Sequence, residues 1–243
     1  MTERSLRDFC TEVKRLIDKL EGILASEKKL LNVIKAELLE MAARHTQPRR
    51  IAALAVADRL GEELRAPDMV GVIEDHVVQV CNGVRRNTVV FFPSYSLMDR
   101  FVEDGVARRI SRPVHLEERG MAQLELMDVV TRFKRTSQEG QVLFAVMGGR
   151  VSEGIDFPED ELELALVVGI PYPRPTAKQR ALMHYYELRF RRGWEYTVKG
   201  PAIRKLQQAI GRLIRTERDV GAALVLDRRI TQFSDRLELL PTE

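Results

Sequence analysis

Residues 207–215, Gln-Gln-Ala-Ile-Gly-Arg-Leu-Ile-Arg, bring an amide, a glycine and two guanidinium groups into one short segment. Gln208, Arg212 and Arg215 are four and three positions apart, so a helix would place them on one face, where they could reach one ligand. Two guanidinium groups aimed at one point favour an anion. A glycine inside a helix, such as Gly211 here, lowers helix stability by about 1 kcal/mol relative to alanine. Its presence therefore indicates that another group approaches the backbone closely at this position. The alternative is a solvated basic helix.

A second candidate is a glycine-containing loop that follows a predicted strand. Residues 141–147 form an apolar run whose length and composition suit a buried strand. The run leads directly into residues 148–158, Gly-Gly-Arg-Val-Ser-Glu-Gly-Ile-Asp-Phe-Pro. Glycines after a buried strand allow backbone amides to turn toward a phosphate or a ribose. The loop therefore predicts a second ligand-binding segment.

The charge of the chain is unevenly distributed. Between Lys178 and Arg218 there are eleven Lys or Arg and three Glu, a net charge of +8, which leaves −5 for the remainder of a chain of net charge +3. A basic block on an otherwise acidic protein is typical of a nucleic-acid or nucleotide partner. The block also contains five aromatic residues, Tyr185, Tyr186, Phe190, Trp194 and Tyr196. Rings among charges could stack on bases, but this spacing favours the core, where we expect most of them.

Predicted helices and strands alternate from about Val70 onward and position these segments. The predicted strands are residues 88–92, 113–116, 141–147, 164–170 and 222–226. The predicted helices lie near residues 73–81, 97–104 and 121–134, with two basic helices before the last strand. This order predicts an α/β fold with a doubly wound, mainly parallel sheet. Ligands of such sheets bind outside the carboxyl ends of the strands, where the glycine loop falls.

The N-terminal part has a different pattern. Apolar residues three or four apart between residues 5 and 41 predict one long helix or a two-helix hairpin, and a shorter helix that includes Ala55 follows Pro48. A joint near Pro67 divides the chain into a helical accessory region, residues 1–70, and an α/β domain, residues 71–243. The helical region could pack against the domain or form a dimer contact.

Several functions are disfavoured by the sequence. No apolar run approaches the roughly 18 residues of a membrane span, and the first residues lack an apolar signal segment, so we expect a cytoplasmic chain with no membrane partner. Cys10 and Cys81 are too few for a four-cysteine iron–sulfur cluster, and the four histidines lack metal-ligand spacing. We therefore expect no metal site and no iron–sulfur cluster in this chain.

The chain also lacks the phosphate-binding loop of a complete nucleotide-hydrolysing motor. No segment reads Gly-x-x-x-x-Gly-Lys-[Ser/Thr]. The triplet Glu74-Asp75-His76 lies in a predicted helix with no buried strand before it, so we do not interpret it as a magnesium-binding carboxylate motif. We expect no ATP hydrolysis by this chain alone.

Three blocks in this order carry a resemblance to a known family. Residues 89–95 (Val-Val-Phe-Phe-Pro-Ser-Tyr), 151–157 (Val-Ser-Glu-Gly-Ile-Asp-Phe) and 208–215 resemble motifs IV, V and VI of superfamily 2 helicases of the XPD and DinG kind. Residues 169–175 and 223–229 are similar to two further family segments. The resemblance runs from about residue 71 to the C-terminus and implies the RecA-like C-terminal motor domain. An arch-like helical insertion precedes this domain in XPD-like proteins, and residues 1–66 match it by position only.

This resemblance implies half of an ATP-dependent DNA helicase. A first motor domain bearing the Walker A loop, in trans or in a longer parent chain, would complete the ATP cleft and hold Mg²⁺. The implied catalytic residues are the arginine fingers Arg212 and Arg215, with Gln208 contacting the nucleotide or organising them. The implied nucleotide-side residues are Gly154, Asp156 and Gly211. The implied contacts to the backbone of single-stranded DNA are Ser94, Tyr95, Arg150 and Ser152, although Ser94 could equally be a helix cap.

Two other functions remain open from the sequence. One is a non-catalytic module that binds nucleic acid without joining an ATP cleft. The other is a regulatory subunit whose arginines sense ATP held by a partner.

Overall fold

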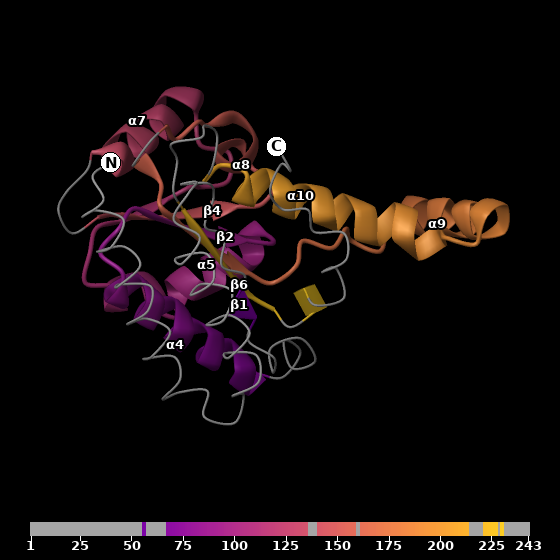
Figure 1. Ribbon diagram of the computed structural model, residues 1–243, viewed down its shortest axis with the longest axis horizontal. Helices are drawn as coiled ribbons and strands as arrows, with labels where there is room; N and C mark the ends of the chain where they lie inside the picture. The colour runs from indigo at the N-terminus through magenta and orange to yellow at the C-terminus, as the bar shows by residue number, and fades with distance from the viewer. Residues whose placement is uncertain are drawn as a thin grey trace, which may run out of the picture.

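The computed structural model describes residues 55–56, 67–135, 140–158, 161–213, 221–227 and 229–230 (Figure 1). Three predictions lie wholly or mostly outside these residues: the long helix or hairpin within residues 5–41, the shorter helix after Pro48 and the position of Arg215. The described strands are β1 (Ala55–Val56), β2 (Thr88–Phe92), β3 (Val114–Leu116), β4 (Val142–Val146), β5 (Leu164–Val168) and β6 (Ala222–Leu226). The described helices are α4 (Pro67–Gly83), α5 (Tyr95–Glu103), α6 (Val106–Arg109), α7 (Gln123–Lys134), α8 (Arg150–Gly154), α9 (Ala177–Phe190) and α10 (Gly200–Ile210), with the π-helical segment η2 (Glu195–Lys199) leading into α10.

The strands form one parallel sheet in the order β1-β6-β5-β2-β4-β3. Every residue of β2, β4, β5 and β6 is buried, because helices cover both faces of the sheet (Figure 1). Strands covered on both faces are apolar throughout rather than alternating, which explains the continuous apolar runs in the sequence. The predicted α/β class and parallel sheet are confirmed, and the predicted strand positions agree with β2 to β6.

Alternate residues of the strands enter two separate cores. Val90 and Phe92 of β2 pack in the core beneath α4, α5 and α6, where the Phe92 ring meets the Phe101 ring edge-on at 5.1 Å. Val89 and Phe91 pack in the opposite core, beneath α7, α8 and α10. The second core therefore ties α8 and α10, which carry both candidate site segments, to the same face of the sheet.

Residues 177–199, comprising α9, the following turn and η2, form a projecting helical arm (Figure 1). No residue of α9 is buried. The return of the chain depends on Gly193, where an added Cβ would lie 2.4 Å from the Met183 carbonyl oxygen. The Gly193 N–H donates to Glu187 Oε2 at 2.8 Å, and the Thr197 hydroxyl donates to the Gly193 carbonyl at 2.7 Å. The arm is thus a closely packed hairpin.

Three expectations from the sequence are wrong. The predicted helix over residues 207–215 ends at Ile210, so Gly211 is its C-cap and Arg212 lies in the following turn. Residues 55–56 form a strand paired with β6 instead of a helix. The aromatic residues of the arm are not in the core, since Tyr185, Phe190, Trp194 and Tyr196 are between 49% and 57% exposed.

Candidate functional site

The turn between β4 and α8 is held by a buried serine. Gly148 has a φ of +79°, which favours glycine, and its N–H donates to Ser152 Oγ at 2.8 Å. The Ser152 hydroxyl donates in turn to the Gly149 carbonyl at 3.0 Å. The Ser152 side chain is fully buried. Its hydroxyl therefore shapes the turn, and its contact with a DNA strand stays a prediction.

Glu117, which sequence reasoning missed, organises the same turn from the end of β3. Its buried carboxylate accepts hydrogen bonds from the Val146 N–H at 3.0 Å, the Arg150 N–H at 2.9 Å and the Tyr95 hydroxyl at 3.2 Å. An added Cβ at Gly149 would lie 2.7 Å from Glu117 Oε1, so the glycine makes room for the carboxylate. The sequence alone could not predict this role, because a single glutamate outside any motif looks like a surface residue. Its role emerges only because β3 and β2 both flank β4.

Ser94 and Tyr95 begin α5 at the end of β2. Ser94 is the N-cap, because its hydroxyl accepts from the Leu97 N–H at 3.3 Å. The Tyr95 hydroxyl donates to Glu117, and the Arg119 guanidinium lies 5.3 Å from the centre of the Tyr95 ring. Burial, followed by the Glu117 carboxylate, raises the pKa of Tyr95, so the phenol stays neutral and keeps its donor.

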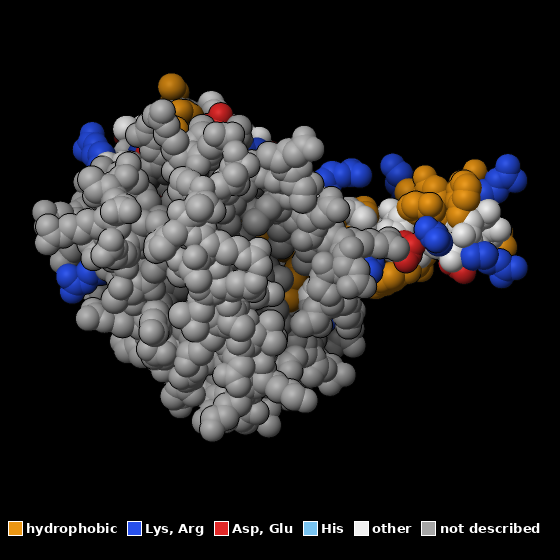
Figure 2. Space-filling view, viewed as in Figure 1, with side chains coloured by type: hydrophobic (Ala, Val, Ile, Leu, Met, Phe, Trp, Pro, Cys, Tyr) orange, Lys and Arg blue, Asp and Glu red, His pale blue; other side chains and the backbone are white. Residues whose placement is uncertain are grey.

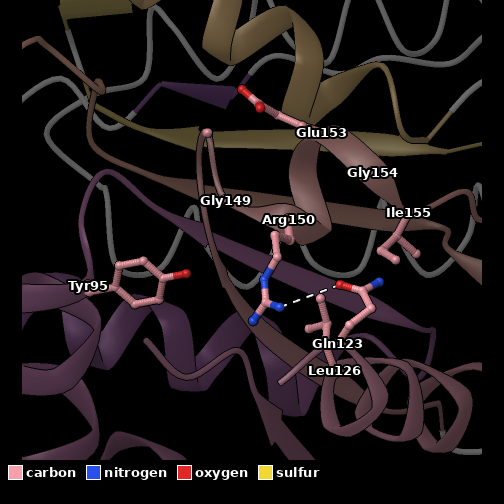
Figure 3. Close-up of a pocket in the computed structure, with 9 residues that line it drawn as sticks. Tyr95, Gln123, Leu126, Gly149, Arg150, Glu153, Gly154 and Ile155 are labelled. Atoms are coloured by element: carbon pink, nitrogen blue, oxygen red, sulfur yellow. Dashed lines mark hydrogen bonds between the residues drawn. The ribbon is translucent and has the colours of Figure 1, made fainter. Parts of the chain in front are cut away.

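These residues border a pocket of about 480 Å³ at the carboxyl edge of the sheet (Figure 3). It is lined by Tyr95, Gln123, Leu126, Gly148, Gly149, Arg150, Glu153, Gly154 and Ile155. In Figure 3 the Arg150 side chain lies between Tyr95 and Gln123. Its guanidinium makes a long contact of 3.5 Å to Gln123 Oε1 and donates to the Met121 carbonyl. An added Cβ at Gly154 would meet no atom within 4 Å, so the wall is open at that position.

Arg212 joins the end of α10 to the pocket loop. Its guanidinium donates to the carbonyl oxygens of Ser152 at 2.8 Å, Glu153 at 3.0 Å and Ile155 at 3.2 Å. It also pairs with Asp156 Oδ1 at 3.1 Å. Only 13% of the Arg212 side chain is exposed, against 66% for Asp156. A cation beside the last carbonyl groups of α8 is favourable, because these groups lack helical partners. The two segments singled out in the sequence therefore meet through this side chain.

Two other side chains of α10 lie near this junction. An added Cβ at Gly148 would be 3.3 Å from Lys205 Nζ, so the Lys205 ammonium reaches the β4–α8 turn. Sequence reasoning missed Lys205, although it is three positions before half-buried Gln208 on the same helix. At Gly211, the close neighbour of an added Cβ is the Gln207 carbonyl of the same helix, at 2.7 Å, rather than a separate group.

A buried carboxylate also orders the carboxyl ends of β5 and β6. Asp227 is fully buried and accepts from the Ile170 N–H at 3.2 Å and from Arg229 Nε at 2.9 Å. Hydrogen bonding to Asp227 raises the pKa of Arg229. The Arg229 guanidinium lies 5.1 Å from the centre of the Tyr172 ring, which is 6.0 Å from the Trp194 ring. This cluster fixes residues 169–175 and leads to the arm.

The remaining titratable candidates lie away from this edge. Glu74-Asp75-His76 is in α4, as predicted. Burial, followed by the nearby Asp104 carboxylate, raises the pKa of Glu74 to about 6. Burial also raises the pKa of Cys81 to about 12, so its thiol is unreactive.

Searches for metal clusters and membrane spans give negative results within the described ranges. No cluster of three or more His, Cys, Asp or Glu side chains in the part that the structure describes could hold a metal ion. Across the same ranges, no helix has both the length and the apolar character needed to cross a bilayer.

Comparisons with known proteins identify the family of the chain. Residues 77–241 match the family described as the helicase C-terminal domain. The chain is 33% identical over 176 residues to the ATP-dependent DNA helicase chl-1 of Caenorhabditis elegans, covering 69% of this chain and 20% of that protein. It is 31% identical over 172 residues to the ATP-dependent DNA helicase XPD of Sulfolobus acidocaldarius, covering 69% of this chain and 29% of that protein. The chain thus spans less than a third of these relatives.

Solved structures show the same relationship. An XPD helicase structure superposes with a TM-score of 0.63 at 25% identity, covering 80% of this chain and 35% of that one. A structure of XPD without ligand gives a TM-score of 0.63 at 27% identity, covering 79% of this chain and 39% of that one. The parallel sheet is therefore the RecA-like sheet of a helicase motor. The chain belongs to the helicase C-terminal domain family of XPD-like superfamily 2 DNA helicases.

Proposed function

We propose that this chain is the C-terminal motor half of an ATP-dependent DNA helicase. A half that bears the Walker A loop, in trans or within a longer parent chain, would complete its ATP cleft and hold Mg²⁺. The observation that carries the proposal is the set of hydrogen bonds from Arg212 to residues 152–156. These bonds bring the guanidinium segment and the glycine loop together at the carboxyl edge of the sheet, where α/β proteins bind ligands.

On the nucleotide side, Arg212 and Arg215 would act as arginine fingers toward the γ-phosphate. Gln208 would contact the nucleotide, with Gly154, Asp156 and Gly211 at the same wall. The chemistry of the donors suits a triphosphate, because the Lys205 ammonium lies beside the β4–α8 turn and the Arg212 guanidinium lies at the carboxyl end of α8. An arginine finger can contribute about 10³ to 10⁵ in rate by stabilising charge that develops in the transition state.

On the nucleic-acid side, the pocket would contact the backbone of single-stranded DNA. The Arg150 guanidinium supplies N–H donors, and the open wall at Gly154 leaves room for a phosphate. Tyr95 would contact the strand from the pocket wall, since its one hydroxyl hydrogen is donated to Glu117. Ser94 would contribute at the start of α5. Ser152 would act indirectly by shaping the turn, and Glu117 would position the Arg150 backbone and the Tyr95 side chain. Such contacts are insensitive to base sequence and weaken with salt.

The backbone of residues 152–156 would couple the nucleotide side of the site to the nucleic-acid side. Glu153 and Ile155 line the pocket, and their carbonyl oxygens accept hydrogen bonds from Arg212. A triphosphate that draws the Arg212 guanidinium toward itself would release these carbonyl groups and alter the pocket wall. Nucleotide binding and hydrolysis would then change the grip on the strand, as a translocating motor requires.

The test is to mix the chain with a polypeptide carrying the Walker A half of an XPD-like helicase. We expect DNA-stimulated ATP hydrolysis and strand separation from the mixture. We expect Arg212→Ala and Arg215→Ala each to reduce hydrolysis about 10³-fold or more while DNA binding is largely kept. Arg132→Ala is the matched control, because this exposed arginine of α7 pairs with Asp128 of the same helix at 2.9 Å and lies outside the site.

The outcomes separate the three functions. Near-normal turnover in both finger variants would refute the finger assignment. Salt-dependent DNA binding without any stimulation of hydrolysis would indicate a binding module. ATP-dependent association without strand separation would indicate a regulatory subunit.

A further inference from the structure

The arm presents a cluster of aromatic rings to solvent. The centre of the Tyr186 ring lies 5.4 Å from that of Tyr185, 6.0 Å from that of Phe190 and 5.4 Å from that of Tyr196. The Phe190 and Tyr196 rings are 5.9 Å apart. Except for half-buried Tyr186, these rings are about half exposed, and α9 has no buried residue. Clustered apolar side chains on a protruding element indicate an interaction surface.

The charge of the arm identifies the class of partner. Residues 177–199 contain six Lys or Arg and two Glu, a net charge of +4. Both glutamates are engaged, Glu187 with the Gly193 N–H and Glu195 with Arg192 at 3.7 Å. Within the described residues, no carboxylate forms an ion pair with Arg189 or Arg191. Figure 2 shows the Lys and Arg side chains around the apolar patch of the arm. This combination favours a polyanion that also has flat apolar faces.

The surface is preorganised and continues to the sheet. Two hydrogen bonds hold the two sides of the arm together: Gln179 Nε2 of α9 donates to the Thr197 carbonyl of η2, and the Gly193 N–H donates to Glu187 of α9. Little conformational freedom therefore remains to be lost on binding. Exposed Trp194 is 6.0 Å from Tyr172, which packs against Arg229 at the carboxyl edge. A strand bound at that edge could therefore extend along the arm.

We propose that the arm binds single-stranded nucleic acid by stacking bases on Tyr185, Phe190, Trp194 and Tyr196, while Arg189 and Arg191 contact phosphates. Stacking on aromatic rings and binding of phosphates by cations together give affinity with little sequence preference. The inference rests on the proposed function for the class of polymer, and it adds a base-contacting surface to the phosphate-contacting pocket.

The experiment compares two oligonucleotides of equal length, about 16 nucleotides, with the full chain and without ATP. One is oligodeoxythymidylate and the other has the same backbone without bases. We expect Tyr185→Ala and Trp194→Ala each to weaken binding of the first about tenfold and to leave binding of the second unchanged. Tyr185→Phe keeps the ring and should bind like the parent. Trp194 is the only tryptophan of the chain, so oligodeoxythymidylate should also quench its fluorescence directly.

The matched control is Leu188→Ala, which removes an exposed apolar side chain without a ring from the same helix and should leave affinity unchanged. Four results would each overturn the proposal. They are unchanged affinity for oligodeoxythymidylate in both ring variants, an equal loss of affinity in Leu188→Ala, unchanged Trp194 fluorescence, and no binding of oligodeoxythymidylate by the parent protein. If Arg150→Ala weakens binding of both oligonucleotides and the ring variants do not, the arm assignment fails while the proposed function stands. Loss of ATPase stimulation by the first motor half without a change in oligonucleotide affinity would show that the arm docks protein instead.

Discussion

At the residue scale, the candidate site depends on carboxylates that accept several hydrogen bonds in buried positions. Glu117 satisfies two backbone N–H groups and one phenol, and Asp227 satisfies two backbone N–H groups and a guanidinium. A buried donor that loses its acceptor bears the cost of desolvation without compensation. These two side chains therefore determine the shape of the edge.

We expect Glu117→Ala to destabilise the protein by about 2 to 4 kcal/mol, because it leaves the Val146 and Arg150 N–H groups and the Tyr95 hydroxyl without their acceptor. Urea unfolding measures this loss. Affinity for oligonucleotides should fall as well, since Tyr95 and Arg150 lose their positioning. Glu118→Ala, at the exposed neighbouring position, should change neither quantity. An unaltered unfolding midpoint for Glu117→Ala would contradict the positioning role.

At the element scale, the stability of each helix and strand depends on the apolar contacts that it makes with the rest of the protein. The arm differs from the rest, because α9 packs on η2 and contributes no residue to either core of the sheet. Its geometry therefore depends on contacts within the arm, among them the close approach at Gly193. The arm should respond to substitution independently of the sheet.

We expect Gly193→Ala to disrupt the arm while the sheet remains folded, because the added Cβ would lie 2.4 Å from a backbone oxygen. Limited proteolysis should then cleave within residues 177–199, and Trp194 fluorescence should shift. Gly71→Ala is the comparison, since an added Cβ there meets no atom within 4 Å. In helix α4 this change should be neutral or stabilising by up to about 1 kcal/mol. Equal protease resistance of Gly193→Ala and the parent would contradict this view of the arm.

The elements predicted best from the sequence are those whose signal is local. The apolar runs of β2, β4, β5 and β6 and the glycine loop after β4 could all be predicted, because buried strands and turns have distinctive compositions. The pairing of residues 55–56 with β6 could not, since it joins parts of the chain far apart in sequence. The aromatic spacing of α9 looks like that of a core helix, and only the tertiary structure shows that no residue of this helix is buried.

In the candidate site too, the individual segments could be predicted from the sequence, but their contacts could not. Arg150, Gly154 and Asp156 stand in a recognisable loop, and Arg212 stands in a recognisable segment. Their junction is a tertiary fact, because the helix ends at Ile210 and the Arg212 side chain turns back to α8. Glu117 was missed because an isolated acid after a three-residue strand is indistinguishable by sequence from a surface residue.

At the scale of the whole molecule, we propose that one chain supplies one wall of a motor and two surfaces for a polyanion. The net charge of +3 hides this organisation, because the basic residues are concentrated on the arm, α10 and the adjoining segment. Charged groups throughout the chain contribute to two properties of the whole molecule, the affinity for a polyanion and the free energy of unfolding.

We expect the affinity for oligodeoxythymidylate to fall linearly with salt on logarithmic axes, because bound phosphates release counterions. Arg150→Ala should make the slope shallower by about 0.7, the contribution of one phosphate contact on a single strand. Titrations at several salt concentrations measure both slopes. Arg132→Ala, on the exposed face of α7, should keep the parent slope, and a parent-like slope for Arg150→Ala would remove this residue from the phosphate contacts.

We expect the free energy of unfolding to fall as the pH rises through the range in which Glu74 ionises. The folded protein raises the pKa of this buried carboxyl from 4.5 to about 6, so it binds a proton more tightly than the unfolded chain. Stability from this group is present below about pH 4.5 and is lost as the pH passes 6, by up to about 2 kcal/mol. Urea unfolding of Glu74→Gln across this range should lack that decline. Glu103→Gln, at an exposed position of α5, should retain it.

The hydrogen bonds from Arg212 to residues 152–156 have a thermodynamic consequence for the assembled motor. One short stretch of backbone touches the guanidinium and also borders the pocket. If ATP alters the affinity for DNA through this stretch, then DNA must alter the affinity for ATP by the same factor, because binding free energies around a closed cycle sum to zero. Weakening the link at Arg212 should therefore diminish both effects together, even where each ligand still binds alone.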